Sequence, residues 1–171
     1  VLREKLAVQF EGYGPANILV TNGAKQGLFE VFQAICDPGR EVIIPSPSWV
    51  SFQHQVRLAG GTPVMVDTIQ HQLDPDAMAH AVTDRTVAIL INSPNNPTGS
   101  VMSRSHMERW VDWARRNAPG LATLGIIAEG DAESRALAAE IEKAADKSGG
   151  WERIKMTQAC LVFAESLLAA D

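Results

Sequence analysis

The sequence is poor in the residues that would assign it to a specialised class. Among its 171 residues there are only two cysteines. Cys36 and Cys160 lie far apart and fit no zinc-binding or redox spacing, which predicts a reduced, cytoplasmic protein without a structural metal. No apolar run approaches the roughly 20 residues that a membrane-spanning helix needs, and no signal peptide is recognisable.

Basic charge is also scarce. Lys and Arg together number 15 against 20 Asp and Glu, so the formal net charge is −5. A nucleic-acid surface needs clustered basic residues, and the adjacent pair Arg115-Arg116 is better explained as a solvated helix end. We therefore expect neither a nucleic acid nor a membrane among the partners of this chain.

Strand-like and helix-like segments alternate over the first 118 residues. Apolar runs predict strands over 18–21, 41–45, 62–67 and 86–92. Helical spacing and cap residues predict helices over 2–10, 24–36, 49–60, 74–82 and from Ser103 or Ser105 to Asn117. Continuous apolar strands are typical of a parallel sheet that helices cover on both faces. The predicted fold class is therefore α/β, a three-layer αβα arrangement with a mostly parallel sheet.

The character of the chain changes after about residue 118. The segment "GLATLGIIA" suits one more strand, and residues 131–147 and 151–170 are predicted as helices, the second strongly apolar. We divide the chain into residues 1–118, part of a large domain, and residues 119–171, an unassigned C-terminal helical tail. The start on Val1, in the middle of a helical pattern, predicts that the natural N-terminus is missing.

Three unusual loops follow three of the predicted strands. They are "NGAKQG" after strand 18–21, "SPSW" after strand 41–45 and "SPNNPTG" after strand 86–92. In parallel sheets of this class, ligands bind outside the carboxyl ends of the strands. If the strands are parallel, all three loops lie at that edge, and we expect a site there.

Each loop offers one chemical feature. Gly23 comes just before a helix, whose free N-terminal amides suit a phosphate, although a simple strand-to-helix turn has the same pattern. Trp49 can stack on a planar ligand or merely pack. Asn96 precedes Pro97, which restricts the Asn96 backbone to an extended or turn conformation and so limits where its side-chain amide can lie. Asn-Pro is, however, also common in turns.

In this order and spacing the three loops resemble the class I/II pyridoxal-phosphate aminotransferases of fold type I, near the aspartate and aromatic aminotransferase branch. The resemblance runs from "LREKLA" through "ILVTNGAKQGLFEVFQAICDPGREVIIPSPSWVSF" to "LDPDAMAHAVTDRTVAILINSPNNPTGSV". It implies that the backbone of Gly23, Ala24 and Lys25 holds the phosphate of pyridoxal 5'-phosphate, that Trp49 stacks on the pyridine ring, and that Asn96 hydrogen-bonds its 3-oxygen. It further implies transfer of an amino group between an amino acid and a 2-oxo acid, in a homodimer.

The remaining machinery of the family has no match. The family needs a Lys for the Schiff base, an Asp at the pyridinium nitrogen, a Tyr near the 3-oxygen and an Arg for the substrate carboxylate. Here Glu129 is the nearest acid at a predicted strand end, Tyr13 is the only tyrosine, and no lysine has the family's context. The catalytic residues are therefore unknown, and we expect no transaminase activity from the isolated chain. A truncated gene, a change of reading frame or a fusion could each produce such a sequence.

Other readings stay open at this point. Decarboxylases, C–S lyases and cyclopropane-forming synthases share the same cofactor loops. A non-catalytic ligand-sensing module or an assembly module, docking through residues 151–170, could derive from the same fold. The sequence does not identify the substrate, although the resemblance of "SPSWVSF" to the aspartate aminotransferase pattern slightly favours acidic or aromatic amino acids.

Overall fold

A computed structural model gives the arrangement of the chain in space. It describes residues 2–8, 13–103, 105–106, 109, 113, 116, 122–127, 153–157 and 161–164. The helices are α1 (Leu2–Ala7), the 3-10 helix η1 (Pro15–Asn17), α2 (Ala24–Ile35), α3 (Ser51–Leu58) and α4 (Pro75–Ala81). The strands are β1 (Ile18–Val20), β2 (Glu41–Ser46), β3 (Thr62–Asp67), β4 (Thr86–Ser93), β5 (Ala122–Ile127), β6 (Arg153–Thr157) and β7 (Leu161–Ala164).

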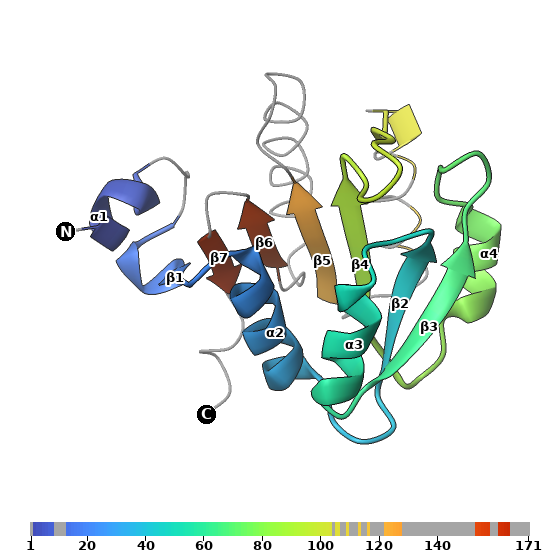
Figure 1. The fold of residues 1–171 in the computed structure, drawn as a ribbon, viewed down its shortest axis with the longest axis horizontal. Coiled ribbons are helices and arrows are strands. Elements are labelled where there is room, and N and C mark those ends of the chain that lie inside the picture. Colours follow the sequence, from blue (N-terminus) through green and yellow to red (C-terminus); the bar gives the residue numbers. More distant parts are fainter. Residues whose placement is uncertain are drawn as a thin grey trace.

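The described strands form one sheet, which is mostly parallel as predicted (Figure 1). Its order is β1-β7-β6-β5-β4-β2-β3. The pairs from β3 through β2, β4 and β5 to β6 are parallel, and β7 is antiparallel to both β6 and β1. Strand β1 therefore runs in the same direction as β6, and the strands that precede the three unusual loops all point toward one edge.

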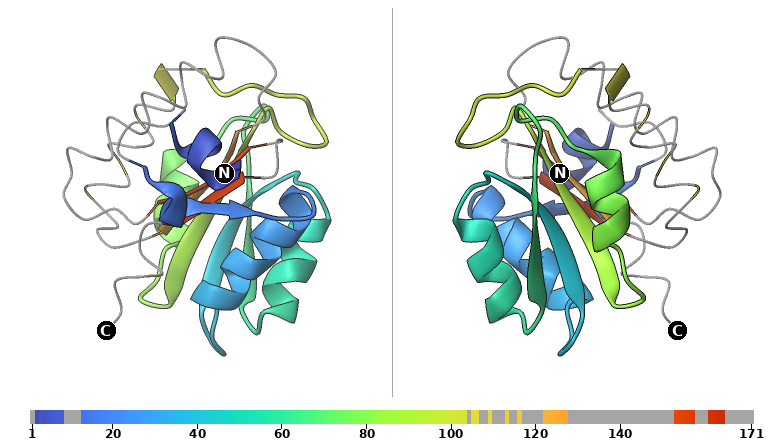
Figure 2. Two further views of the ribbon diagram at one scale, coloured as in Figure 1. Left: turned by 90° about the vertical axis from the view of Figure 1, so that its left-hand side faces the viewer. Right: turned by 90° about the vertical axis from the view of Figure 1, so that its right-hand side faces the viewer.

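Helices cover both faces of the sheet, which confirms the three-layer prediction (Figure 2). α2 and α3 pack on one face and α4 on the other. Successive residues of β2 serve the two faces in turn, because Val42 and Ile44 join the core under α2 and α3 while Ile43 joins the core under α4. All three side chains have no exposed surface. Burying each contributes about 1.5 to 3 kcal/mol of transfer free energy, so β2 is a central anchor of the sheet.

Local sequence signals set the helix ends. Asp74 caps α4, since its carboxylate accepts a hydrogen bond of 3.1 Å from the amide of Asp76. α3 ends in a glycine motif in which the Gly60 amide donates to the Arg57 carbonyl and the Gly61 amide to the Val56 carbonyl, both at 3.0 Å. Gly60 has φ +89°, the left-handed conformation that glycine adopts without strain.

One prediction for the C-terminal part is wrong. Residues 153–157 and 161–164 are the strands β6 and β7, where a single helix over 151–170 was expected. The physical reason is that segments as short as RIKMT and LVFA fit a helix and a strand equally well, and pairing with β5 and β1 decides for the strand. The strand predicted from "GLATLGIIA", residues 120–128, is confirmed as β5. The boundary at residue 118 remains a prediction, although β5, β6 and β7 join the same sheet.

Other predicted segments have partial descriptions. The helix expected over 131–147 lies outside the described residues, as does most of the helix expected up to Asn117. At the start of the latter, the Ser103 hydroxyl accepts a hydrogen bond from the His106 amide at 3.3 Å, the contact of a helix cap. No helix among the described residues has both the length and the apolar character that crossing a membrane requires.

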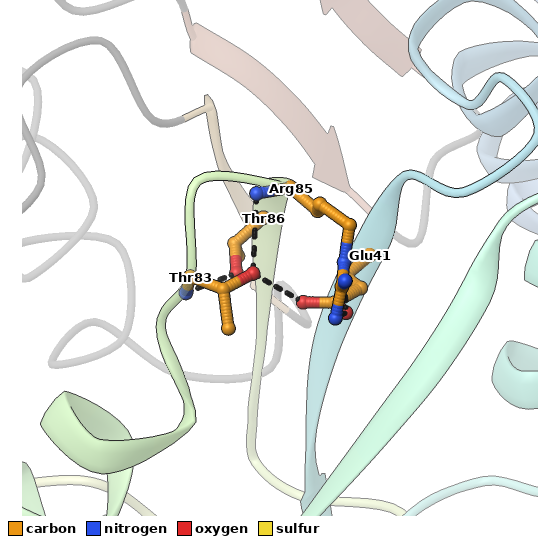
Figure 3. A network of polar contacts seen from close by, with 4 residues as sticks. All are labelled: Glu41, Thr83, Arg85 and Thr86. Atoms are coloured by element: carbon orange, nitrogen blue, oxygen red, sulfur yellow. Dashed lines mark hydrogen bonds and ion pairs between the residues drawn. The ribbon is translucent and has the colours of Figure 1, made fainter.

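The edge of the sheet away from the three loops is closed by a polar network (Figure 3). Glu41, at the start of β2, accepts from Nε and Nη2 of Arg85 at 2.8 and 2.6 Å and from the Thr83 hydroxyl at 2.6 Å. These bonds join β2 to the turn before β4. The Thr83 hydroxyl, followed by Arg85, holds the pKa of the Glu41 carboxyl below its usual value.

Candidate functional site

The three unusual loops meet at the carboxyl edge of the sheet, as predicted (Figure 1). The first leads from β1 into α2, the second from β2 into α3, and the third follows β4. β1 is an outer strand of the sheet, but α2 contacts β7, β6 and α3 and so crosses the sheet toward β2. The start of α2 therefore lies beside the loop that carries Trp49.

The first loop presents the N-terminus of α2. Gly23 precedes the helix with φ +82°, and a Cβ built there meets no atom within 4 Å, so the space in front of the loop is open. The Thr21 hydroxyl donates to the Gly23 carbonyl at 3.0 Å, which fixes the loop. Ala24 and Lys25 are the first helical residues, so their amides lack an acceptor within the helix. This arrangement suits an anionic oxygen such as that of a phosphate.

The second loop places Trp49 against the first. The indole is half-buried, and its ring packs edge-on against Phe52 with the centroids 5.4 Å apart. Nζ of Lys25 lies over the indole ring at 4.7 Å from its centroid. The structure thus brings together two of the predicted residues, and it presents a cation and an aromatic face side by side.

The side chain that stabilises the third loop by hydrogen bonds is Asn95 and not Asn96. Nδ2 of Asn95 donates to the Pro47 carbonyl at 3.0 Å and to the Thr98 hydroxyl at 2.9 Å. Its backbone amide donates to the Ser100 carbonyl at 2.8 Å. The Asn96 side chain is exposed and makes no hydrogen bond to another described residue. Asn95 therefore holds the third loop against the second, while the Asn96 side chain stays exposed.

A second hydrogen bond connects the elements that carry the first two loops. Gln55, on α3, has 7% of its surface exposed, and its Nε2 donates to the Lys25 carbonyl at 2.7 Å. The other atom of this amide, Oε1, is buried without a hydrogen-bond partner among the described residues. Gln55 thus connects α3, the helix that follows the Trp49 loop, to the first turn of α2.

Sequence reasoning singled out neither Asn95 nor Gln55. For Asn95 the sequence offers no signal, because two adjacent asparagines look alike until their environments are known. Gln55 does leave a signal, since it falls on the helical face defined by Phe52 and Val56, and a polar residue on a buried face needs a reason.

A small hollow adjoins the third loop without including the predicted residues. Its volume is about 30 Å³, and its polar lining includes Ser48, Asn92 and Asn95. Such a volume holds about one or two water molecules, which is too little for a pyridine ring. A ligand that met Gly23, Trp49 and Asn96 would therefore lie on the open face of the loops.

The remaining machinery is not assembled in the described part of the chain. Tyr13 packs in the small cluster between α1 and β1, and Glu129 lies outside the described residues. Lys5 lies in α1 and Lys155 in β6, so Lys25 is the lysine at the carboxyl edge among those described. No group of three metal-ligating side chains occurs in the residues that the structure places.

Comparison with known proteins supplies the family context. The family model described as "Aminotransferase class I and II" matches residues 1–121. The aspartate/prephenate aminotransferase of Thermus thermophilus is 47% identical over 115 residues, covering 63% of this chain and 30% of that protein. The aspartate aminotransferase of Thermotoga maritima is 41% identical over 143 residues, covering 82% of this chain and 37% of that protein. The chain thus spans about a third of the length of these relatives.

Solved structures agree in fold. The Thermus thermophilus aspartate aminotransferase with maleate has a TM-score of 0.72 at 33% identity, over 95% of this chain and 46% of that chain. The Thermotoga maritima aspartate aminotransferase has a TM-score of 0.75 at 30% identity, over 96% of this chain and 48% of that chain. The likeness extends beyond residue 121 into the part that carries β5, β6 and β7.

Proposed function

We propose, from the premise that this chain belongs to the class I and II aminotransferases, that it forms the cofactor-binding part of a pyridoxal-phosphate-dependent amino-acid aminotransferase. The family uses pyridoxal 5'-phosphate. The observation that carries the proposal is the meeting of three loops at one sheet edge: a helix N-terminus opened by Gly23, the indole of Trp49, and the amide of Asn96.

The residues present fit the cofactor in three ways. The amides of Gly23, Ala24 and Lys25 bind the phosphate, because the helix N-terminus favours negative charge and Gly23 has no side chain to block the approach. Trp49 stacks on the ring. The Lys25 ammonium, on a flexible stem, turns from the indole toward the anionic ligand. The phosphate end and the ring end of the ligand thus meet adjacent groups.

Asn96 completes the proposed site by donating a hydrogen bond to the 3-oxygen of the ring. The bound cofactor supplies an electron sink for chemistry at the α-carbon of an amino acid. The chain's own contribution is to hold and orient it, because Asn95 fixes the loop that carries Asn96 against the loop that carries Trp49. Catalysis needs further groups, which we assign to no described residue.

The same proposal covers the substrates, the oligomeric state and the location of the whole protein. Its substrates are an amino acid and a 2-oxo acid, and the names of the relatives, which include aspartate, favour an acidic amino acid. A homodimer in the cytoplasm is the proposed form. The isolated chain binds the cofactor without transaminase activity, since no lysine other than Lys25 lies at the described carboxyl edge.

The direct test is to titrate the purified 171-residue chain with pyridoxal phosphate and to record the visible spectrum, then reduce with borohydride and measure the intact mass. Saturable binding without a covalent adduct is the expected result. A stable adduct on one lysine would instead identify a catalytic lysine and overturn the proposed inactivity. Absence of binding would overturn the cofactor site.

Two substitutions with a matched control locate the binding. Asn96→Ala and Gly23→Val are each expected to weaken binding by about tenfold, since each removes or blocks one contact worth roughly 1.4 kcal/mol. Gly39 has φ +89° and open space around it, like Gly23, but lies in the turn before β2 at the opposite edge. Gly39→Val imposes the same backbone strain and should leave binding unchanged.

A further inference from the structure

Gln55 lies where a nonpolar residue would be expected. Its neighbours on the inner face of α3, Phe52 and Val56, are both buried in the core under α2 and α3. The side chain of Gln55 is buried as well, with one hydrogen bond from Nε2 to the Lys25 carbonyl and no partner for Oε1 among the described residues. An acceptor buried without a partner lowers stability, so an apolar side chain of the same length would serve the core better.

The single hydrogen bond of Gln55 does not serve the helix that receives it. The Lys25 carbonyl belongs to the first turn of α2 and, by regular helix geometry, already accepts from the amide four residues later. The hydrogen bond from Gln55 instead sets the position of the first turn of α2 relative to α3. That turn carries the amides of Ala24 and Lys25, and the residue just before α3 is Val50, which follows Trp49.

We infer that Gln55 is a positioning residue that holds the phosphate-binding turn of α2 in register with Trp49, at a cost in stability. The inference rests on the proposed function, because register between these two groups matters only for a ligand that spans them. An anionic ligand with a planar ring, such as pyridoxal phosphate, is such a ligand. Gln55 touches neither end of it and acts through the backbone of Lys25.

The same helix pair supplies a matched control. Gln33, on α2, donates through Nε2 to the Leu58 carbonyl at 3.5 Å, so it also links α2 to α3. Gln33 is exposed, and its hydrogen bond joins the last turn of α2 to the last turn of α3, away from the carboxyl edge. Exchanging each glutamine for methionine removes one α2–α3 hydrogen bond while keeping the length of the side chain.

The experiment compares the 171-residue parent, Gln55→Met and Gln33→Met in three measurements. These are the urea midpoint of unfolding, amide hydrogen exchange in the peptide spanning residues 23–30, and the dissociation constant for pyridoxal phosphate. For Gln55→Met we expect a midpoint equal to or above that of the parent, exchange faster in that peptide alone, and binding weaker by about fivefold, the effect of losing one hydrogen bond. Gln33→Met should match the parent in exchange and in binding.

Each outcome decides the inference. Unchanged exchange and unchanged affinity in Gln55→Met would overturn it. A lower midpoint with faster exchange throughout the chain would also overturn it, because Gln55 would then be a structural core residue. If the parent itself fails to bind pyridoxal phosphate, the proposed function fails separately, and the exchange at residues 23–30 still shows whether Gln55 holds that turn.

Discussion

Asn95 and Asn96 are neighbours with the same side chain and different surroundings. Both hydrogens of the Asn95 amide have acceptors, one in its own loop and one at Pro47 in the loop after β2. The amide of Asn96 is exposed. Because one asparagine uses its donors to hold two loops together, the other is free of that structural role and can meet a ligand.

Exchanging the amide of Asn95 for a carboxylate should separate these roles. Asn95→Asp removes both donors and places negative charge against the Pro47 carbonyl, so we expect a loss of about 1 kcal/mol in the free energy of unfolding together with weaker cofactor binding. Asn96→Asp should weaken binding while leaving stability unchanged. Urea unfolding and a pyridoxal-phosphate titration of both variants measure this. Equal stability of Asn95→Asp and the parent would contradict the role of Asn95 in holding the two loops together.

Cys36 offers a second test at the scale of one residue. Burial, followed by the charge of Asp37, raises the pKa of its thiol to about 11. At pH 8 only about one thiol in a thousand is then ionised, so the folded protein should react with a disulfide reagent very slowly. The measurement uses Cys160→Ser, which leaves Cys36 as the sole thiol. Labelling should be slow in buffer and fast in urea, and rapid labelling in buffer would contradict the burial of this side chain.

Among the elements, the turn between β3 and α4 carries backbone strain. Gln70 and His71 have φ +50° and +61°, in the left-handed region, and the turn is closed by two hydrogen bonds between Ile69 and Gln72. The turn also braces the third loop, because the Ser100 hydroxyl donates to the His71 carbonyl at 3.1 Å. Positive φ at both central residues is the geometry that Asn-Gly adopts most easily.

Relieving that strain should stabilise the protein. Gln70→Asn combined with His71→Gly keeps every backbone bond of the turn, and we expect a gain of about 1 kcal/mol in the free energy of unfolding. Gln70→Ala changes the side chain and retains the strain, so it should bring no gain. Urea unfolding of the two variants decides. A loss of stability in the Asn-Gly variant would show that the side chains, rather than the backbone, govern this turn.

For the molecule as a whole, the two edges of the sheet differ in chemistry. The carboxyl edge holds the loops with Gly23, Trp49 and Asn96. The amino edge is closed by the Glu41–Arg85 pair, in which Glu41 is buried and the Arg85 side chain is 61% exposed. Because solvent screens the arginine, the pair contributes modestly, and the hydrogen bond from Thr83 leads among the causes that lower the pKa of Glu41.

The lowered pKa of Glu41 predicts how stability depends on pH. The carboxyl group has a lower pKa when folded than its usual 4.5, so its contribution is fully present above about pH 4.5 and is lost as the pH falls through the folded value. Glu41→Gln should therefore be less stable than the parent at pH 7, by on the order of 1 kcal/mol, and the difference should shrink below pH 4.5. Urea unfolding at pH 7, 5 and 3.5 measures it.

Glu30→Gln, on α2, is the control for the loss of one negative charge away from the network. It should lose no comparable stability at pH 7. A difference between parent and Glu41→Gln that stays constant from pH 7 to pH 3.5 would contradict the assigned role of the ionised carboxylate.

Local patterns in the sequence specify the alternation of strands and helices up to β4, the two-sided burial of β2, and the three unusual loops after β1, β2 and β4. These features follow from local patterns: continuous apolar runs, the Asp74-Pro75 helix start, and glycines at the ends of elements. They also indicate which chemistry the loops can offer, because Gly23, Trp49 and Asn96 occur together in a characteristic order and spacing.

The remaining features depend on contacts between residues that are distant in the chain. Strands β6 and β7 exist because they pair with β5 and β1, which are distant in the chain, and a segment of four or five residues does not specify that pairing. The roles of Asn95 and Gln55 depend on carbonyl groups 48 and 30 positions away in sequence. Hydrogen bonds over such separations form only once the sheet has brought the loops together. Local sequence patterns therefore do not predict them.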